Sequence, residues 1–124
     1  MHEMPVTQSL LNMILEEAKD CRVTDIYIDV GEVSFIVPDQ VEIFFKYLSR
    51  GTIAENARLH FQTKPLEIKC PDCKRPCDLS AFRDEEPRAV LYKALSRECE
   101  CGNQKMGITN GTGFELVSIE VEKS

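Results

Sequence analysis

Four cysteines in the second half of the chain have the spacing of a metal site. Cys70 and Cys73 form a C-x-x-C pair, and Cys99 and Cys101 form a C-x-C pair that Gly102 follows. Four thiolates around one ion make a closed tetrahedral shell, which is typical of structural zinc, because catalytic zinc keeps one position open for water. We therefore expect Zn(II) here with a role in folding and no chemistry at this ion.

A fifth cysteine in this region leaves the ligand set open. Cys77 could replace Cys99 or Cys70 as a ligand. The C-x-x-C pair could also be a redox dithiol, but Pro76 and its charged neighbours differ from the strand-to-helix context of such motifs. Cys21 stands apart, and we interpret it as a small buried residue near the end of a helix. The expected zinc ligands are Cys70, Cys73, Cys99 and Cys101, with Cys77 as the substitute.

The first residues offer a second kind of metal site. We expect Met1 to remain in place, because removal of an initiator methionine requires a small residue after it, and His2 is large. The α-amine, the deprotonated backbone nitrogen of His2 and its imidazole could chelate a square-planar Ni(II) or Cu(II) ion, with the backbone nitrogen of Glu3 or another residue at the fourth corner. The alternative is a solvated, disordered terminus. His60 is either the polar face of a strand or an additional nickel contact.

The composition limits the classes of protein that this chain can be. Its 124 residues, 43% apolar and 29% charged, fit one domain or one domain with a small satellite, and exclude two independent enzyme domains. Fifteen Lys and Arg against 21 Asp and Glu give a net charge of −6, so we expect no nucleic acid partner. No segment reaches the roughly 18 uninterrupted apolar residues of a membrane span. We expect a cytoplasmic protein with no membrane partner and reduced thiols.

Hydrophobic periodicity predicts the elements that position these sites. Apolar residues recur every three or four positions in helical segments and at every second position in strands. The expected helices cover residues 5–20, 38–50 and 86–97, and the expected strands cover residues 23–30, 57–63 and 114–122. In the last strand, we expect Val117, Ile119 and Val121 to share one face.

These elements predict an α+β fold: a two-layer core of two helices on a three-stranded sheet, with an inserted cysteine-rich, zinc-ribbon-like module. The last strand follows the cysteine segment, so we expect the module to lie between two strands of one sheet. The predicted division is a nickel-binding α/β domain of residues 1–68 plus 109–124, and an inserted zinc-binding domain of residues 69–108. The insertion has little apolar surface, so we expect that it cannot build a core alone.

The order of short motifs along the chain resembles the HypA family. The motifs are MHEM at the start, VGEVS at residues 30–34, RGT at residues 50–52, the cysteine pairs, and NGTGFELVSIEVE at residues 110–122. HypA proteins are nickel metallochaperones that help insert nickel into [NiFe]-hydrogenase and, in some organisms, urease. The resemblance implies nickel at His2 with nearby backbone nitrogens and Glu3, and zinc at the cysteine pairs. It also implies a HypB-type GTPase and the hydrogenase large-subunit precursor as partners.

The chain departs from the family pattern at the second cysteine pair. The family usually has C-P-x-C there, so Glu98 stands where a cysteine is expected, and the segment between Cys73 and Cys99 is longer than is usual. The main alternative function is a zinc-ribbon adaptor or nucleic-acid-binding protein, which would share the cysteine pairs but has no need of the MHE start. The acidic charge and the absence of a basic patch count against that alternative. Metal analysis of the purified protein separates these functions.

Overall fold

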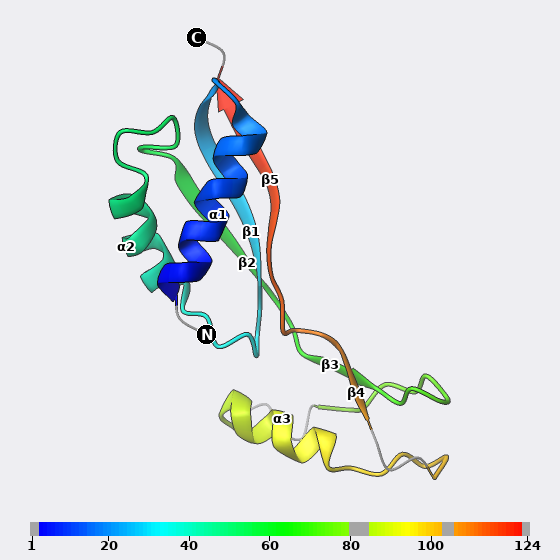
Figure 1. The fold of residues 1–124 in the computed structure, drawn as a ribbon. Helices are drawn as coiled ribbons and strands as arrows, with labels where there is room; N and C mark the ends of the chain where they lie inside the picture. The colour runs from blue at the N-terminus through cyan, green and yellow to red at the C-terminus, as the bar shows by residue number, and fades with distance from the viewer. Residues whose placement is uncertain (1–2, 80–84, 103–105, 123–124) are drawn as a thin grey trace. The chain divides into compact units, whose positions relative to one another are not determined.

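The computed structural model describes residues 3–79, 85–102 and 106–122, which form three helices and five strands. The elements are α1 (Glu3–Ala18), β1 (Arg22–Gly31), α2 (Pro38–Leu48), β2 (Arg58–Lys64), β3 (Glu67–Lys69), α3 (Pro87–Leu95), β4 (Gly107–Asn110) and β5 (Phe114–Glu122) (Figure 1). The predicted α+β fold is confirmed, and all three expected helices are present. No helix among the described residues is long and apolar enough to cross a membrane.

The chain divides into two compact units. The first comprises Met1–Val30, Phe35–Thr63 and Phe114–Ser124, and the second comprises Gly31–Ser34 and Lys64–Gly113. The first unit contains a three-stranded sheet in the order β2-β1-β5, in which β1 and β5 are antiparallel. Both α1 and α2 cover one face of this sheet (Figure 1). This arrangement is the predicted two-layer core of two helices on three strands.

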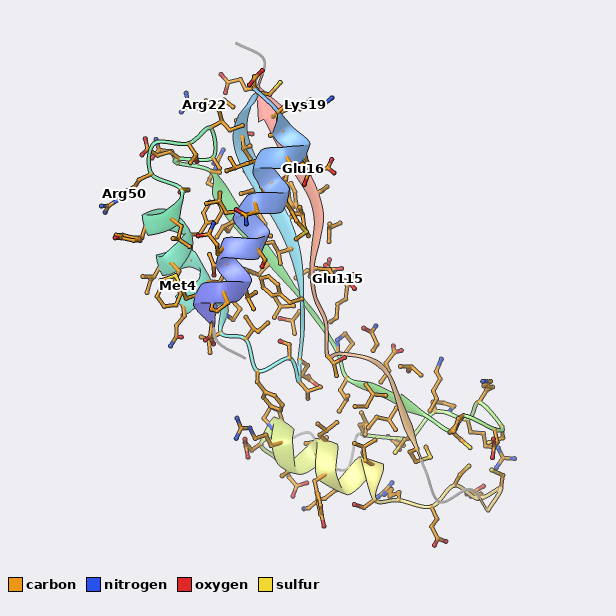
Figure 2. The ribbon with its side chains drawn as sticks, in the orientation of Figure 1. Met4, Glu16, Lys19, Arg22, Arg50 and Glu115 are labelled. Carbon is orange, nitrogen blue, oxygen red and sulfur yellow. The ribbon has the colours of Figure 1, made fainter. Side chains whose placement is uncertain are left out.

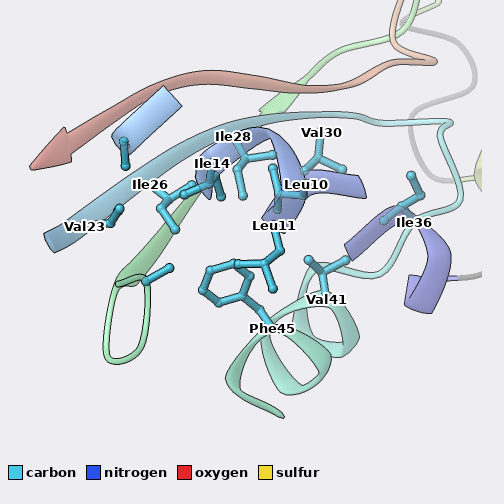
Figure 3. Packing of buried hydrophobic residues seen from close by; sticks show 12 residues of the cluster. Leu10, Leu11, Ile14, Val23, Ile26, Ile28, Val30, Ile36, Val41 and Phe45 are labelled. Atoms are coloured by element: carbon cyan, nitrogen blue, oxygen red, sulfur yellow. The ribbon is translucent and has the colours of Figure 1, made fainter. Parts of the chain in front are cut away.

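The core of the first unit lies between the helices and the sheet. On α1, Leu10, Leu11 and Ile14 are buried because their spacing places them on one helical face. Val41 and Phe45 of α2 meet them, together with the buried residues of the central strand (Figure 3). The buried residues of β1 in this cluster are Val23, Ile26, Ile28 and Val30.

Two bulges change the predicted alternation of the strands. The β1–β5 register shifts between Tyr27 and Ile28, so that Val117 of β5 is an extra residue with no partner of its own in the register. The residues of β5 that pack on the core are Phe114, Leu116 and Ile119. Val121 pairs with the buried Val23 and keeps the period of two with Ile119, as predicted. Val117 is 58% exposed, so the prediction that it shares the face of Ile119 is wrong. The reason is that a bulge breaks the period of two on which that prediction depends.

The second unit has a small apolar core that the sequence pattern did not predict. Strands β3 and β4 form an antiparallel two-stranded sheet. The α3 helix places Val90 and Ala94 with Leu66 and Ile68 in one buried cluster, which Val33 completes. Among the described residues, 69–108 contribute only Val90 and Ala94 to this cluster, so the expectation that this range cannot build a core alone is confirmed. Leu66, Ile68 of β3 and Val33 from the loop after β1 supply the rest.

Candidate metal centre

The first cysteine pair lies on a tight turn directly after β3. The backbone N–H of Lys74 donates to the carbonyl of Cys70 at 2.9 Å, and the N–H of Cys70 donates to the carbonyl of Arg75 at 2.9 Å. Lys74 adopts a positive φ of 65°, which reverses the chain immediately after Cys73. The turn brings the two sulfurs of the pair to one side, with Cys70 buried and Cys73 exposed.

The second cysteine pair lies on a similar turn after α3. The N–H of Gly102 donates to the carbonyl of Cys99 at 2.9 Å, and Gly102 has a φ of 95°. In both pairs, therefore, the residue after the second cysteine is in the left-handed region. That conformation costs nothing at a glycine but is strained at Lys74.

The four sulfurs of these two turns form one group. Cys70 Sγ lies 3.6 Å from Cys101 Sγ, and Cys73 Sγ lies 3.4 Å from Cys99 Sγ. All four sulfurs lie within 4.8 Å of one another. A tetrahedral zinc site with Zn–S bonds near 2.3 Å has sulfur–sulfur edges of about 3.8 Å. The group therefore has the size of a four-cysteine zinc site, and the shorter C-x-C spacing does not prevent Cys99 from joining it.

The electrostatics of the group favour a bound cation. A hydrogen bond from the Cys73 backbone lowers the pKa of Cys70 to about 6. At Cys99, a hydrogen bond from the Cys101 backbone lowers the pKa, but the neighbouring thiols and burial outweigh it and raise the pKa to about 12. Four adjacent thiols cannot all ionise without a positive charge among them, and a divalent ion supplies that charge.

An exposed ion pair also joins the two turns. Arg75 Nη1 lies 2.9 Å from Glu100 Oε2, but the two side chains are 62% and 88% exposed. An exposed ion pair of this kind contributes only about 0–1 kcal/mol. The convergence of the four sulfurs is thus the main link between the turns, which fits a structural role for the metal.

The two remaining cysteines lie away from this group. Cys77 packs against the apolar cluster of the second unit, and its N–H donates to the carbonyl of Ile68 at 2.7 Å. Cys21 is half-buried between α1 and β1, so its predicted position on a helix is wrong. The helix ends at Ala18, and Lys19, with a φ of 56°, turns the chain toward β1.

Of the residues predicted to bind nickel, the structure describes Glu3. Met1 and His2 lie outside the described residues. Glu3 is the first residue of α1, so the helix begins two positions before its predicted start at Pro5. The Oε1 atom of Glu3 accepts a hydrogen bond from the N–H of Val37 at 3.3 Å. The contact holds the first turn of α1 against the loop that leads into α2.

His60 lies on the polar face of β2, as one of its two interpretations predicts. Its Nε2 lies 2.8 Å from Asp25 Oδ1, and its ring stacks on Tyr27 at a centroid distance of 4.8 Å. Asp25 also lies 3.4 Å from the Nε of Arg58. The sequence alternation placed Asp25 on the polar face, but only the structure shows that its neighbours leave the residue 9% exposed.

Comparison with known proteins identifies the family. The family model described as hydrogenase/urease nickel incorporation, metallochaperone, hypA, matches residues 1–121. The hydrogenase maturation factor HypA of Geotalea uraniireducens is 31% identical over 122 residues, covering 98% of this chain and 100% of the relative. That of Caldanaerobacter subterraneus subsp. tengcongensis is 34% identical over 126 residues, covering 98% of this chain and 100% of the relative.

Two solved structures share the fold. The solution structure of a HypA protein matches with a TM-score of 0.72 and 22% identity over 100% of this chain and 98% of that chain. The Ni metallochaperone HypA from Helicobacter pylori matches with a TM-score of 0.67 and 24% identity over 100% of both chains. Nickel is the metal of this family, and the four-cysteine group is consistent with zinc. The chain therefore belongs to the HypA family, whose members are nickel metallochaperones and maturation factors and not enzymes.

Proposed function

We propose that this chain binds Ni(II) at its N-terminus and delivers it to a [NiFe]-hydrogenase during maturation. The family match carries the proposal, because it begins at residue 1 and so includes His2 and Glu3. The α-amine of Met1, the imidazole of His2 and the backbone nitrogens of His2 and Glu3 are the proposed nickel donors. A carrier must release its ion, and a terminal site with few donors releases nickel more readily than a closed cage of side chains does. The family description also names urease, which makes a urease a second candidate for the recipient.

Zinc has a separate, structural role in this proposal. Cys70, Cys73, Cys99 and Cys101 are the proposed ligands, since their sulfurs form one group and Cys77 lies outside it. Zn(II) bound there would join the two cysteine turns without an open coordination position. We further propose the division of residues 1–68 plus 109–124 for nickel and residues 69–108 for zinc.

The proposed partners follow from the maturation role. A HypB-type GTPase and the hydrogenase large-subunit precursor would act with this chain in the cytoplasm. The family's role in hydrogenase maturation supports interaction with the maturation machinery in general. We propose these two proteins as the specific partners.

A nickel titration of the untagged, zinc-loaded protein tests the function. The chain has two histidines, so His60→Ala is a matched control for His2→Ala. His2→Ala should abolish high-affinity nickel binding, whereas His60→Ala should keep it, because His60 is held by Asp25 and Tyr27 on the sheet. Zinc content and the circular dichroism spectrum should not change in either variant. Nickel binding by His2→Ala as tight as that of the native protein would place the nickel site elsewhere.

A further inference from the structure

The last strand, β5, is an edge of the three-stranded sheet. It spans nine residues and pairs with β1 along one side. A long edge strand offers main-chain hydrogen-bonding groups to a further strand, and proteins usually protect such an edge. Here the bulge at Val117 and the exposed glutamates of the strand are the protective features.

A groove runs between this edge and α1. Its cavity has a volume of about 640 Å³, and its lining is Met13, Glu16 and Glu17 of α1 with Phe114–Ile119 of β5. Leu116 and Ile119 contribute apolar surface, and the exposed side chains of Met13 and Val117, 46% and 58% accessible, extend this surface to solvent. Figure 2 shows Glu16 on α1 and Glu115 on β5, which belong to the two sides of this groove.

The charges on the groove have one sign. Three carboxylates line it, those of Glu16, Glu17 and Glu115, and no Lys or Arg is part of the lining. None of the three forms an ion pair with a basic side chain in the part of the chain that the structure describes. An apolar surface that carries several carboxylates is complementary to a segment in which apolar and basic residues alternate.

We propose that the α1–β5 groove binds an extended, basic and amphipathic segment of a partner protein, which adds to the sheet as a strand beside β5. Main-chain hydrogen bonds to the edge would supply affinity, and alternate side chains would supply specificity. Apolar side chains would contact Val117, Leu116 and Met13, and Lys or Arg side chains would face the three glutamates. A second copy of this chain is disfavoured, because pairing two β5 edges would bring Glu115, Glu120 and Glu122 of both copies together.

A fluorescence-anisotropy titration with a labelled synthetic peptide tests this inference. The probe is a short peptide in which lysine alternates with valine, and the control probe has glutamate in place of each lysine. The zinc-loaded, nickel-free full chain should bind the lysine peptide saturably, should not bind the glutamate peptide, and should lose affinity as salt is raised. Hydrogen exchange should show new protection of the β5 amides in the complex. Omitting nickel makes this result independent of the proposed nickel function.

Variants of the groove separate specific docking from general charge attraction. Glu115→Lys should weaken peptide binding by about tenfold or more. Glu67→Lys makes the same charge change at an exposed position of β3 and should leave binding nearly unchanged. Val117→Ser should also weaken binding, and we expect it to keep the fold because Val117 is 58% exposed and outside the core cluster. Equal effects of Glu115→Lys and Glu67→Lys would overturn the proposal.

Two further results would also overturn it. The first uses a peptide of the same composition whose valines are placed at helical spacing. If this peptide binds more tightly than the alternating peptide, strand addition is excluded. A dimer of the chain alone that Val117→Ser dissociates would show that a second copy occupies the edge.

Discussion

Cys73 Sγ lies 3.4 Å from Cys99 Sγ although the two residues are 26 positions apart in the chain. This contact assigns Cys99, rather than Cys77, to the sulfur group. Cys99→Ser should therefore lower the zinc content of the purified protein below one ion per chain. Cys77→Ser should keep its zinc and lose only about 1 kcal/mol of stability, because its side chain packs against an apolar cluster. Elemental analysis and urea denaturation measure both effects, and the reverse pattern of zinc loss would make Cys77 the ligand.

The residues after the two cysteine pairs give a test of backbone strain. Lys74 and Gly102 both have positive φ angles. Lys74→Gly should be neutral or stabilise the zinc-loaded protein by up to about 1 kcal/mol, because glycine adopts this conformation without strain. Gly102→Ala should destabilise it by about 1 kcal/mol through conformation alone, since no atom lies within 4 Å of a Cβ at this position. Thermal unfolding of each variant measures the difference, and a stabilising effect of Gly102→Ala would contradict the explanation.

Removal of zinc should loosen the second unit selectively. Five of the described residues form its buried apolar cluster, which is small for independent stability. Metal binding in zinc modules contributes roughly 10–16 kcal/mol to folding. Strong chelation, or Cys70→Ala combined with Cys73→Ala, should therefore remove hydrogen-exchange protection from residues 69–108. Protection in α1, β1 and α2 should remain. If the protein is purified without zinc and residues 69–108 are still protected from hydrogen exchange, zinc has no structural role.

The ion pair of Asp25 should give the stability a defined pH dependence. The hydrogen bond from His60 is the largest cause that lowers the pKa of Asp25, while burial opposes it and Arg58 assists. A carboxylate with a lower pKa in the folded state stabilises the fold above its unfolded pKa, near about 4. This contribution is lost as the pH falls through the folded pKa. Asp25→Asn should thus be destabilising at pH 7, and its difference from the native protein should shrink in strong acid.

The exposed residue Asp20 supplies the control for that series. Asp20→Asn should have little effect at either pH, because Asp20 lies exposed after α1. Urea denaturation of the three proteins at neutral and acid pH checks the prediction. If the difference in unfolding free energy between Asp25→Asn and the native protein stays constant with pH, lost packing rather than lost charge causes the destabilisation.

Nickel binding should weaken as the pH falls. The proposed donors include an imidazole, an amine and backbone nitrogens, so that binding releases protons. Affinity should fall steeply through the imidazole range near about 6.5. An N-terminal tag should weaken binding by changing the α-amine, whereas a C-terminal tag should not. Competition titrations over a pH series measure this dependence, and an affinity independent of pH would exclude these donors.

The periodicity of the sequence predicted most elements of the first unit because their burial is one-sided. Leu10, Leu11 and Ile14 mark the buried face of α1, and Val41 and Phe45 mark that of α2. The prediction for β5 was wrong at Val117, since a bulge is decided by the pairing with β1 and leaves no signature in the alternation. The short strands β3 and β4 were missed for a related reason. Strands of three or four residues are too short to show a clear period.

The sequence by itself determined the fold class, the helices and the chemistry of the cysteines, because periodicity and ligand type are local properties. It left the ligand set open between Cys77 and Cys99, since spacing along the chain does not state which sulfurs meet in space. Only the tertiary structure shows which sulfurs meet, by placing the turn after β3 beside the turn after α3 and leaving Cys77 against the apolar cluster. The burial of Asp25 and the groove along β5 were decided in the same way, because both depend on neighbours from distant segments.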